Sequence, residues 1–144
     1  MALATVSVSD VAISNTNQIK HVFAGEEISI GSCVFRSGGP DGQYFNTDAD
    51  ALATAPLDLD GSEYGLSLNE APGAGAPLAI ARSGAEVYLG AGAMFTGFTY
   101  FAGNQLGALE DVQPPSGEYG ITAGVAIDTG TIALRFHATG IATA

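Results

Sequence analysis

The sequence contains few positive charges. Lys20, Arg36, Arg82 and Arg135 are scattered among 15 acidic residues, so the 144-residue chain has a formal net charge of −11. Proteins that bind nucleic acid use lysine and arginine to displace the counterions of the phosphates. Four scattered cations form no basic stripe along the chain. The composition therefore argues against DNA, RNA and an anionic membrane surface as partners.

Cysteine, tryptophan and long apolar runs are also scarce or absent. The single cysteine, Cys33, excludes an intramolecular disulfide, and there is no tryptophan. No apolar run reaches the ~18 residues of a membrane-spanning helix. The first residues lack the positively charged start of a signal peptide. We expect a soluble protein that is synthesised in a cytoplasm.

Strand signals dominate what remains. Short runs rich in Val, Ile, Thr, Phe and Tyr are interrupted by turn residues roughly every 8–12 positions, a spacing typical of β-sandwiches and barrels. We predict an all-β fold, formed by a single compact β-sandwich or small β-barrel domain. The expected strands cover residues 3–8, 19–23, 32–36, 43–45, 64–68, 78–81, 86–89, 98–101, 119–127 and 131–137. One short helix is expected at 48–55, because Pro56 disfavours helix at the residue before it.

The last predicted strand shows the clearest alternation. Ile132, Leu134 and Phe136 should face one way, and Thr131, Arg135 and His137 the other. A hairpin connection at 128–130 should precede this strand.

Three pairs of segments are similar and occur in the same order along the chain. They are 31–35 with 97–101, 63–66 with 118–121, and 78–80 with 132–134. One interpretation is a duplication that produces two similar β units, which pack together because neither buries its apolar face alone. The other is chance similarity between glycine- and alanine-rich strands.

Residues 1–18 differ in composition from the β-rich domain that we expect over 19–144. Small polar residues alternate there with β-branched ones, so the segment should be extended. It is either the first strand of its own domain or an arm that adds to the edge of a partner's sheet. The candidate docking side chains of such an arm are Val6, Val8, Val11 and Ile13.

No motif for catalysis or metal binding emerges. His21 and His137 have no adjacent nucleophile motif such as G-x-S-x-G, and Cys33 stands where a small apolar residue is expected. Oxygen ligands on loops suit Ca²⁺, but the acidic residues lack the spacing of an EF-hand loop. We interpret them as a solvated face and predict no catalytic residue, cofactor or metal. These acids are Asp41, Asp48, Asp50, Asp58, Asp60 and Glu63.

A succession of short motifs carries a family resemblance. It runs through Ala-Gly-Glu-Glu-Ile at 24–28, Asp-Gly-Gln-Tyr at 41–44, Tyr-Gly-Leu-Ser-Leu-Asn-Glu-Ala at 64–71, Leu-Gly-Ala-Gly at 89–92, Gly-Phe-Thr-Tyr at 97–100 and Ser-Gly-Glu-Tyr at 116–119. In this order the motifs resemble the head-decoration, or capsid cement, proteins of tailed bacteriophages, over roughly residues 24–140. The chain departs from the family pattern at 65–68, which is Gly-Leu-Ser-Leu instead of Gly-Ile-Ala-Leu, and at the double proline 114–115.

The resemblance implies a structural protein of the virion and not an enzyme. Such a protein binds the outer surface of the expanded head and clamps neighbouring major capsid subunits. It also implies a homo-oligomer, with a trimer favoured over a dimer, and an acidic surface suits the outside of a shell. The candidate oligomer contacts are Phe95, Phe98 and Phe101.

A different class of function stays open beside this one. A phage fibre, a tail protein or a surface-adhesion module would share the β architecture and bind a host glycan or receptor. Exposed aromatic rings would make that contact. The candidates are Tyr44, Phe45, Phe98 and Tyr100.

Overall fold

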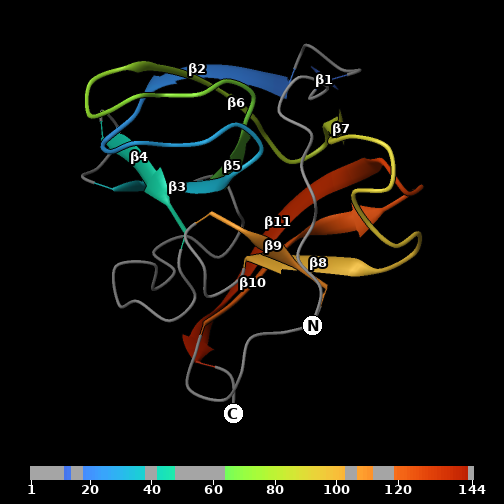
Figure 1. Cartoon of the computed structure of the whole chain (residues 1–144). Coiled ribbons are helices and arrows are strands. Elements are labelled where there is room, and N and C mark those ends of the chain that lie inside the picture. Colours follow the sequence, from blue (N-terminus) through green and yellow to red (C-terminus); the bar gives the residue numbers. More distant parts are fainter. Residues whose placement is uncertain are drawn as a thin grey trace.

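The computed structural model describes residues 12–13, 18–37, 42–47, 64–102, 107–111 and 119–142. Two antiparallel sheets pack together in this part of the chain, and neither closes into a barrel (Figure 1). The fold is all-β, as expected, and of the two expected architectures it is the sandwich. The helix expected at 48–55 and the strand expected at 3–8 lie outside the described residues.

One sheet has five strands in the spatial order β2-β6-β5-β3-β4, and the other has six in the order β1-β7-β11-β10-β8-β9. Their bounds are β1 (Ala12–Ile13), β2 (Ile19–Phe23), β3 (Cys33–Ser37), β4 (Gln43–Asn46), β5 (Tyr64–Ser67), β6 (Pro77–Ala81), β7 (Glu86–Tyr88), β8 (Thr99–Ala102), β9 (Leu109–Glu110), β10 (Tyr119–Ala126) and β11 (Thr131–Ala142). Every strand predicted within the described residues is present, and its ends differ from the prediction by at most one residue except at the end of β11. The two-residue strands β1 and β9 were not predicted.

The two sheets share one connectivity. Five strands of each sheet follow one another along the chain, β2 to β6 in one sheet and β7 to β11 in the other. When the five are numbered 1 to 5 along the chain, both sheets have the spatial order 1-5-4-2-3, that is β2-β6-β5-β3-β4 and β7-β11-β10-β8-β9. The short β1 is added outside β7. The similar sequence segments fall on equivalent strands: β3 with β8, β5 with β10, and β6 with β11. Topology and sequence therefore agree on two similar β units.

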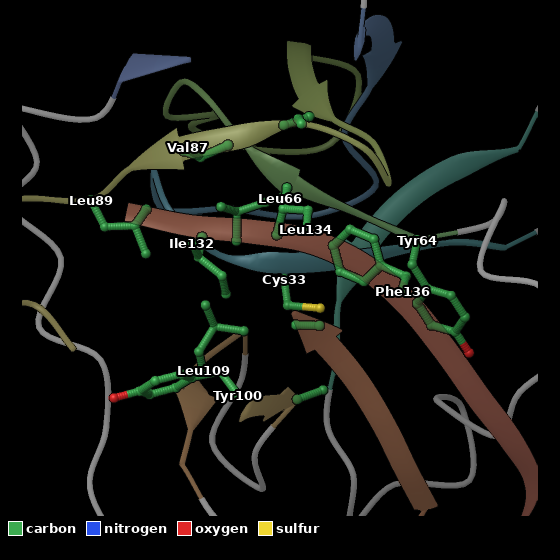
Figure 2. Close-up of a cluster of buried hydrophobic side chains, with 14 of the residues drawn as sticks. Cys33, Tyr64, Leu66, Val87, Leu89, Tyr100, Leu109, Ile132, Leu134 and Phe136 are labelled. Atoms are coloured by element: carbon green, nitrogen blue, oxygen red, sulfur yellow. The ribbon is translucent and has the colours of Figure 1, made fainter. Parts of the chain in front are cut away.

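The main core lies between the two sheets. In Figure 2, Cys33 and Leu66 of the five-stranded sheet lie close to Ile132 of β11. The rings of Tyr64 and Phe136 stack across the same space, with centroids 6.3 Å apart and an interplanar angle of 22°. Burial of one large aliphatic side chain contributes about 1.5–3 kcal/mol, so this core is the main source of stability.

The five-stranded sheet is buried on both faces. Val34, Leu78 and Ile80 point away from the main core into a second, smaller cluster. The loops between β2 and β3 and between β5 and β6 close over this cluster. Ile28 and Ala71, one from each loop, exchange backbone hydrogen bonds of 2.9 and 2.8 Å. The first unit thus has a core of its own besides the one that it shares.

Gly107, between β8 and β9, ties the second unit to the first. Its N–H donates to the carbonyl of Thr47, and its carbonyl accepts from the N–H of Cys33, both at 2.8 Å. Its φ is +72°, and a Cβ added to it would lie 2.7 Å from the Cβ of Ser32. Glycine meets both demands at this junction, because it has no Cβ and tolerates positive φ.

Candidate interaction surface

The residues with reactive side chains are either buried or far apart. Cys33 is fully buried in the main core, and desolvation raises the pKa of its thiol to about 12, although a hydrogen bond with Thr47 opposes the shift. A thiol in that state is not nucleophilic near neutral pH, as the structural interpretation of Cys33 requires. His21 and His137 are exposed and belong to different sheets.

The acidic stretch predicted to form a solvated face lies outside the described residues. Asp41, Asp48, Asp50, Asp58, Asp60 and Glu63 all belong to it. In the described ranges, no group of three or more His, Cys, Asp or Glu side chains is arranged to hold a metal ion. The same part of the chain contains no helix long and apolar enough to cross a bilayer.

Most of the aromatic residues suggested as glycan contacts are covered. Tyr44 and Tyr100 are each 1% exposed, the first in the smaller cluster and the second in the main core. Phe45 is half-buried, and its ring lies 6.2 Å from that of Phe35. Phe98 is therefore the exposed one of the four candidates, with 49% of its surface accessible.

Phe98 forms an exposed pair with Phe95 in the loop between β7 and β8. The two rings lie 5.5 Å apart between centroids, and Phe95 is 56% exposed. The loop backbone is anchored, since Phe95 N–H donates to the Tyr100 hydroxyl at 3.0 Å. Gly97 N–H donates to the Ala126 carbonyl at 2.7 Å. Because the backbone is already held, a partner that binds these rings orders little additional chain.

Phe101, the third candidate oligomer contact, does not join this pair. It is half-buried in β8 and lies opposite Thr122 of β10. Side chains alternate along a strand, and Tyr100 and Ala102 point into the main core. Phe101 therefore faces the other side of the six-stranded sheet.

That other side, the outer face of the six-stranded sheet, contains a concave surface. Its lining includes Thr99 of β8, Thr122 and Val125 of β10, and Ala133, Arg135 and His137 of β11. Ile132, Leu134 and Phe136 alternate with the β11 residues and are buried, so the alternation predicted for this strand is confirmed.

The concave surface could not be found from the sequence. Strand β10 changes register between Thr122 and Gly124 against both of its neighbours. An irregularity of this kind breaks the two-residue period, so periodicity alone does not put Val125 on the same face as Thr122. The usable signal is the pair Arg135 and His137, two of the chain's few basic or imidazole residues, on one face of one strand.

The N-terminal candidates are separated by the structure. Ile13 belongs to β1, pairs with Val87 of β7 and packs half-buried against the main core. Ile13 thus belongs to a strand of its own domain, which is the first of the two interpretations of this segment. Val6, Val8 and Val11 lie outside the described residues, and their role in docking stays a prediction.

No family model matches the chain, and no curated protein is similar to it.

Proposed function

We propose that this protein is a capsid decoration protein of a tailed bacteriophage. It binds the outer surface of the expanded head and clamps neighbouring major capsid subunits against internal DNA pressure. The ordered succession of motifs from residue 24 onward supports the phage family. The observation that carries a binding role is the exposed, backbone-anchored pair Phe95 and Phe98. Aromatic side chains in such a position are typical anchors of protein interfaces.

Clamping follows from preferential binding. A protein that binds the expanded shell and not its precursor stabilises the expanded shell by RT ln(1 + [L]/Kd) at each site. Self-association strengthens the effect, because a second contact then forms at high effective concentration. We favour a trimer on the shell over a dimer, with Phe95 and Phe98 as the self-contact. Phe101 faces a different side of the sheet and is a weaker candidate.

The N-terminal segment is the second proposed contact with the shell. Residues 2–11 precede β1, so their deletion leaves the pairing of Ile13 with Val87 in place. We expect the truncated protein to keep its melting temperature within about 2 °C, equivalent to less than ~1 kcal/mol, and to bind heads more weakly. Thermal unfolding and head binding are measured together. A truncated protein that binds heads with unchanged affinity contradicts the docking role of Val6, Val8 and Val11.

The direct test is co-sedimentation of the purified protein with expanded, undecorated heads and with unexpanded precursors of the same phage. We expect binding to expanded heads alone, weakened in the double variant Phe95→Ser/Phe98→Ser. Phe23→Ser is the matched control, since Phe23 is 59% exposed but lies in the other unit, at the end of β2.

Absence of co-sedimentation contradicts the proposal. Binding on a glycan array without affinity for heads identifies the protein as a surface-adhesion module instead, and the exposed ring of Phe98 is the observation that favours this second candidate.

A further inference from the structure

We propose that the concave outer face of the six-stranded sheet binds an acidic surface of a protein partner. The face is lined by Thr99, Thr122, Val125, Ala133, Arg135 and His137. That the partner is the major capsid protein rests on the proposed function. That the face binds carboxylates of a protein rests on the three observations that follow.

The first observation is that the two units turn equivalent residues inward. Val34 of β3 and Tyr100 of β8 occupy matching places in the similar segments, as do Ile80 of β6 and Leu134 of β11. Val34 and Ile80 point into the smaller cluster, which is the first unit's own core. Tyr100 and Leu134 point into the main core. At β3/β8 and β6/β11 the two units therefore have corresponding inner and outer faces, whereas Leu66 of β5 and Ile121 of β10, from the third similar pair, both point into the main core.

The second observation is that, within the part of the chain that the structure describes, a sheet covers the outer face of the first unit but not that of the second. Cys33 and Phe35 lie on the outer face of the first unit, and both are buried against the second unit. Their counterparts in the second unit are Thr99 and Phe101, which are partly exposed. The outer face of the first unit thus packs against the second unit, whereas the equivalent face of the second unit lies at the surface.

The chemistry of the exposed face suits a separable partner. Val125 is 41% exposed, and Thr99, Thr122 and Ala133 surround it with small side chains. The buried contact of the first unit has Cys33 where the exposed face has the polar Thr99, and both faces have a phenylalanine at the other place, Phe35 and Phe101. Interfaces that form and separate are about as polar as the rest of the surface. The mixture of threonine, valine and alanine therefore fits docking of a partner better than permanent burial.

The third observation is the charge of the concave surface. Among the described residues, its lining includes Arg135 and His137 and no acidic side chain, in a chain with a net charge of −11. Glu86 and Glu110 belong to the neighbouring strands β7 and β9 and do not line it. Arginine is permanently charged and binds carboxylates through two parallel hydrogen bonds. Nucleic acid needs a larger basic surface to overcome the repulsion of this chain, so acidic protein side chains fit better.

The test compares charge changes on the face with the same change elsewhere. Binding of the full chain to expanded heads should weaken at least about tenfold in Arg135→Glu and in Thr99→Glu, and Thr99→Lys should bind at least as tightly as the unmodified protein. Lys20→Glu is the matched control. Lys20 is partly exposed, lies in β2 of the other sheet and does not line the concave surface, so binding should be unchanged there.

A second measurement does not depend on heads. A short peptide of alternating valine and glutamate is titrated into the labelled protein, and amide chemical shifts are followed by NMR. Shifts centred on Thr122, Val125 and Ala133, lost in Arg135→Glu and absent with a valine–lysine peptide, support the proposal. Equal effects of Arg135→Glu and Lys20→Glu on head binding, shifts elsewhere, or stronger shifts with duplex DNA overturn it. Failure to bind heads with intact peptide shifts rejects the capsid function and leaves the face as proposed.

Discussion

Replacement of Gly107 by alanine tests how the two units are joined. The residue has a φ of +72°, and an added Cβ would lie 2.7 Å from the Ser32 Cβ and 2.8 Å from the Asn46 Oδ1. Both contacts belong to the first unit, whereas Gly107 belongs to the second. The backbone of Gly107 also bonds to Cys33 and Thr47, so neither side can retreat without loss of a hydrogen bond.

Two effects contribute to the expected loss of stability. A left-handed conformation costs an L-residue about 1–2 kcal/mol, and overpacking of a tight contact costs about 1–3 kcal/mol more. We therefore expect Gly107→Ala to lower the free energy of unfolding by about 2–5 kcal/mol. Gly75→Ala separates the two effects, because Gly75 has a φ of +83° and open space around it. That variant should lose about 1–2 kcal/mol.

Urea unfolding of the wild type, Gly107→Ala, Gly75→Ala and the double variant Gly107→Ala/Ser32→Gly provides the measurement. Ser32→Gly removes the nearer contact, so the double variant should lose less than the sum of its two single changes. Equal losses in Gly107→Ala and Gly75→Ala would refute the close approach of the two units. Strict additivity of the double variant would show that Ser32 is not what the new methyl group meets.

Three further experiments probe the cores and the last hairpin. Gly65→Ala should lower the free energy of unfolding by about 1–2 kcal/mol, because the new Cβ would lie 2.8 Å from the Ile80 Cδ1. Gly73→Ala is the control and should cause no loss, since there is open space around Gly73. Similar losses in both variants would contradict two-sided burial of the five-stranded sheet. Cys33 should react with a thiol reagent only as the protein unfolds, and immediate labelling of the native protein would disprove its burial. Backbone hydrogen bonds lower the pKa of the Asp128 carboxyl group. Its carboxylate therefore stabilises the fold fully at pH values above the ordinary carboxyl pKa of about 3.9. This stabilisation is lost as the pH falls through the lowered pKa. Asp128→Asn should therefore be less stable than the wild type at neutral pH, and a stability difference that does not shrink as the pH falls below the ordinary carboxyl pKa would contradict this.

Local pattern was sufficient to predict the strands themselves. Alternation along β11 placed Ile132, Leu134 and Phe136 on one face of the strand, and the structure confirms this, with all three buried. The strands β1 and β9 were missed because two residues contain no period. They exist through pairing with β7 and β8, which is a tertiary contact.

Which faces are covered could not be predicted in the same way. Tyr44 and Tyr100 were expected to be exposed, yet both are buried. Alternation shows that neighbouring side chains point to opposite faces, but not which of the faces packs against something. Tyr44 illustrates this limit, since the loops over the smaller cluster bury the second face of its sheet. The concave surface with Arg135 was missed for the related reason that three strands and a change of register build it.

If this chain stabilises an expanded phage head, as we propose, the temperature at which such heads release their DNA measures that effect most directly. Heads without decoration are heated with increasing amounts of the protein and of Phe95→Ser/Phe98→Ser. At a free concentration of about 100 times Kd, binding stabilises each site by about 2.7 kcal/mol, so the release temperature should rise with the wild type and level off as the sites fill. The double variant should raise it much less at the same concentration. A release temperature that does not change under saturating wild-type protein would contradict the account.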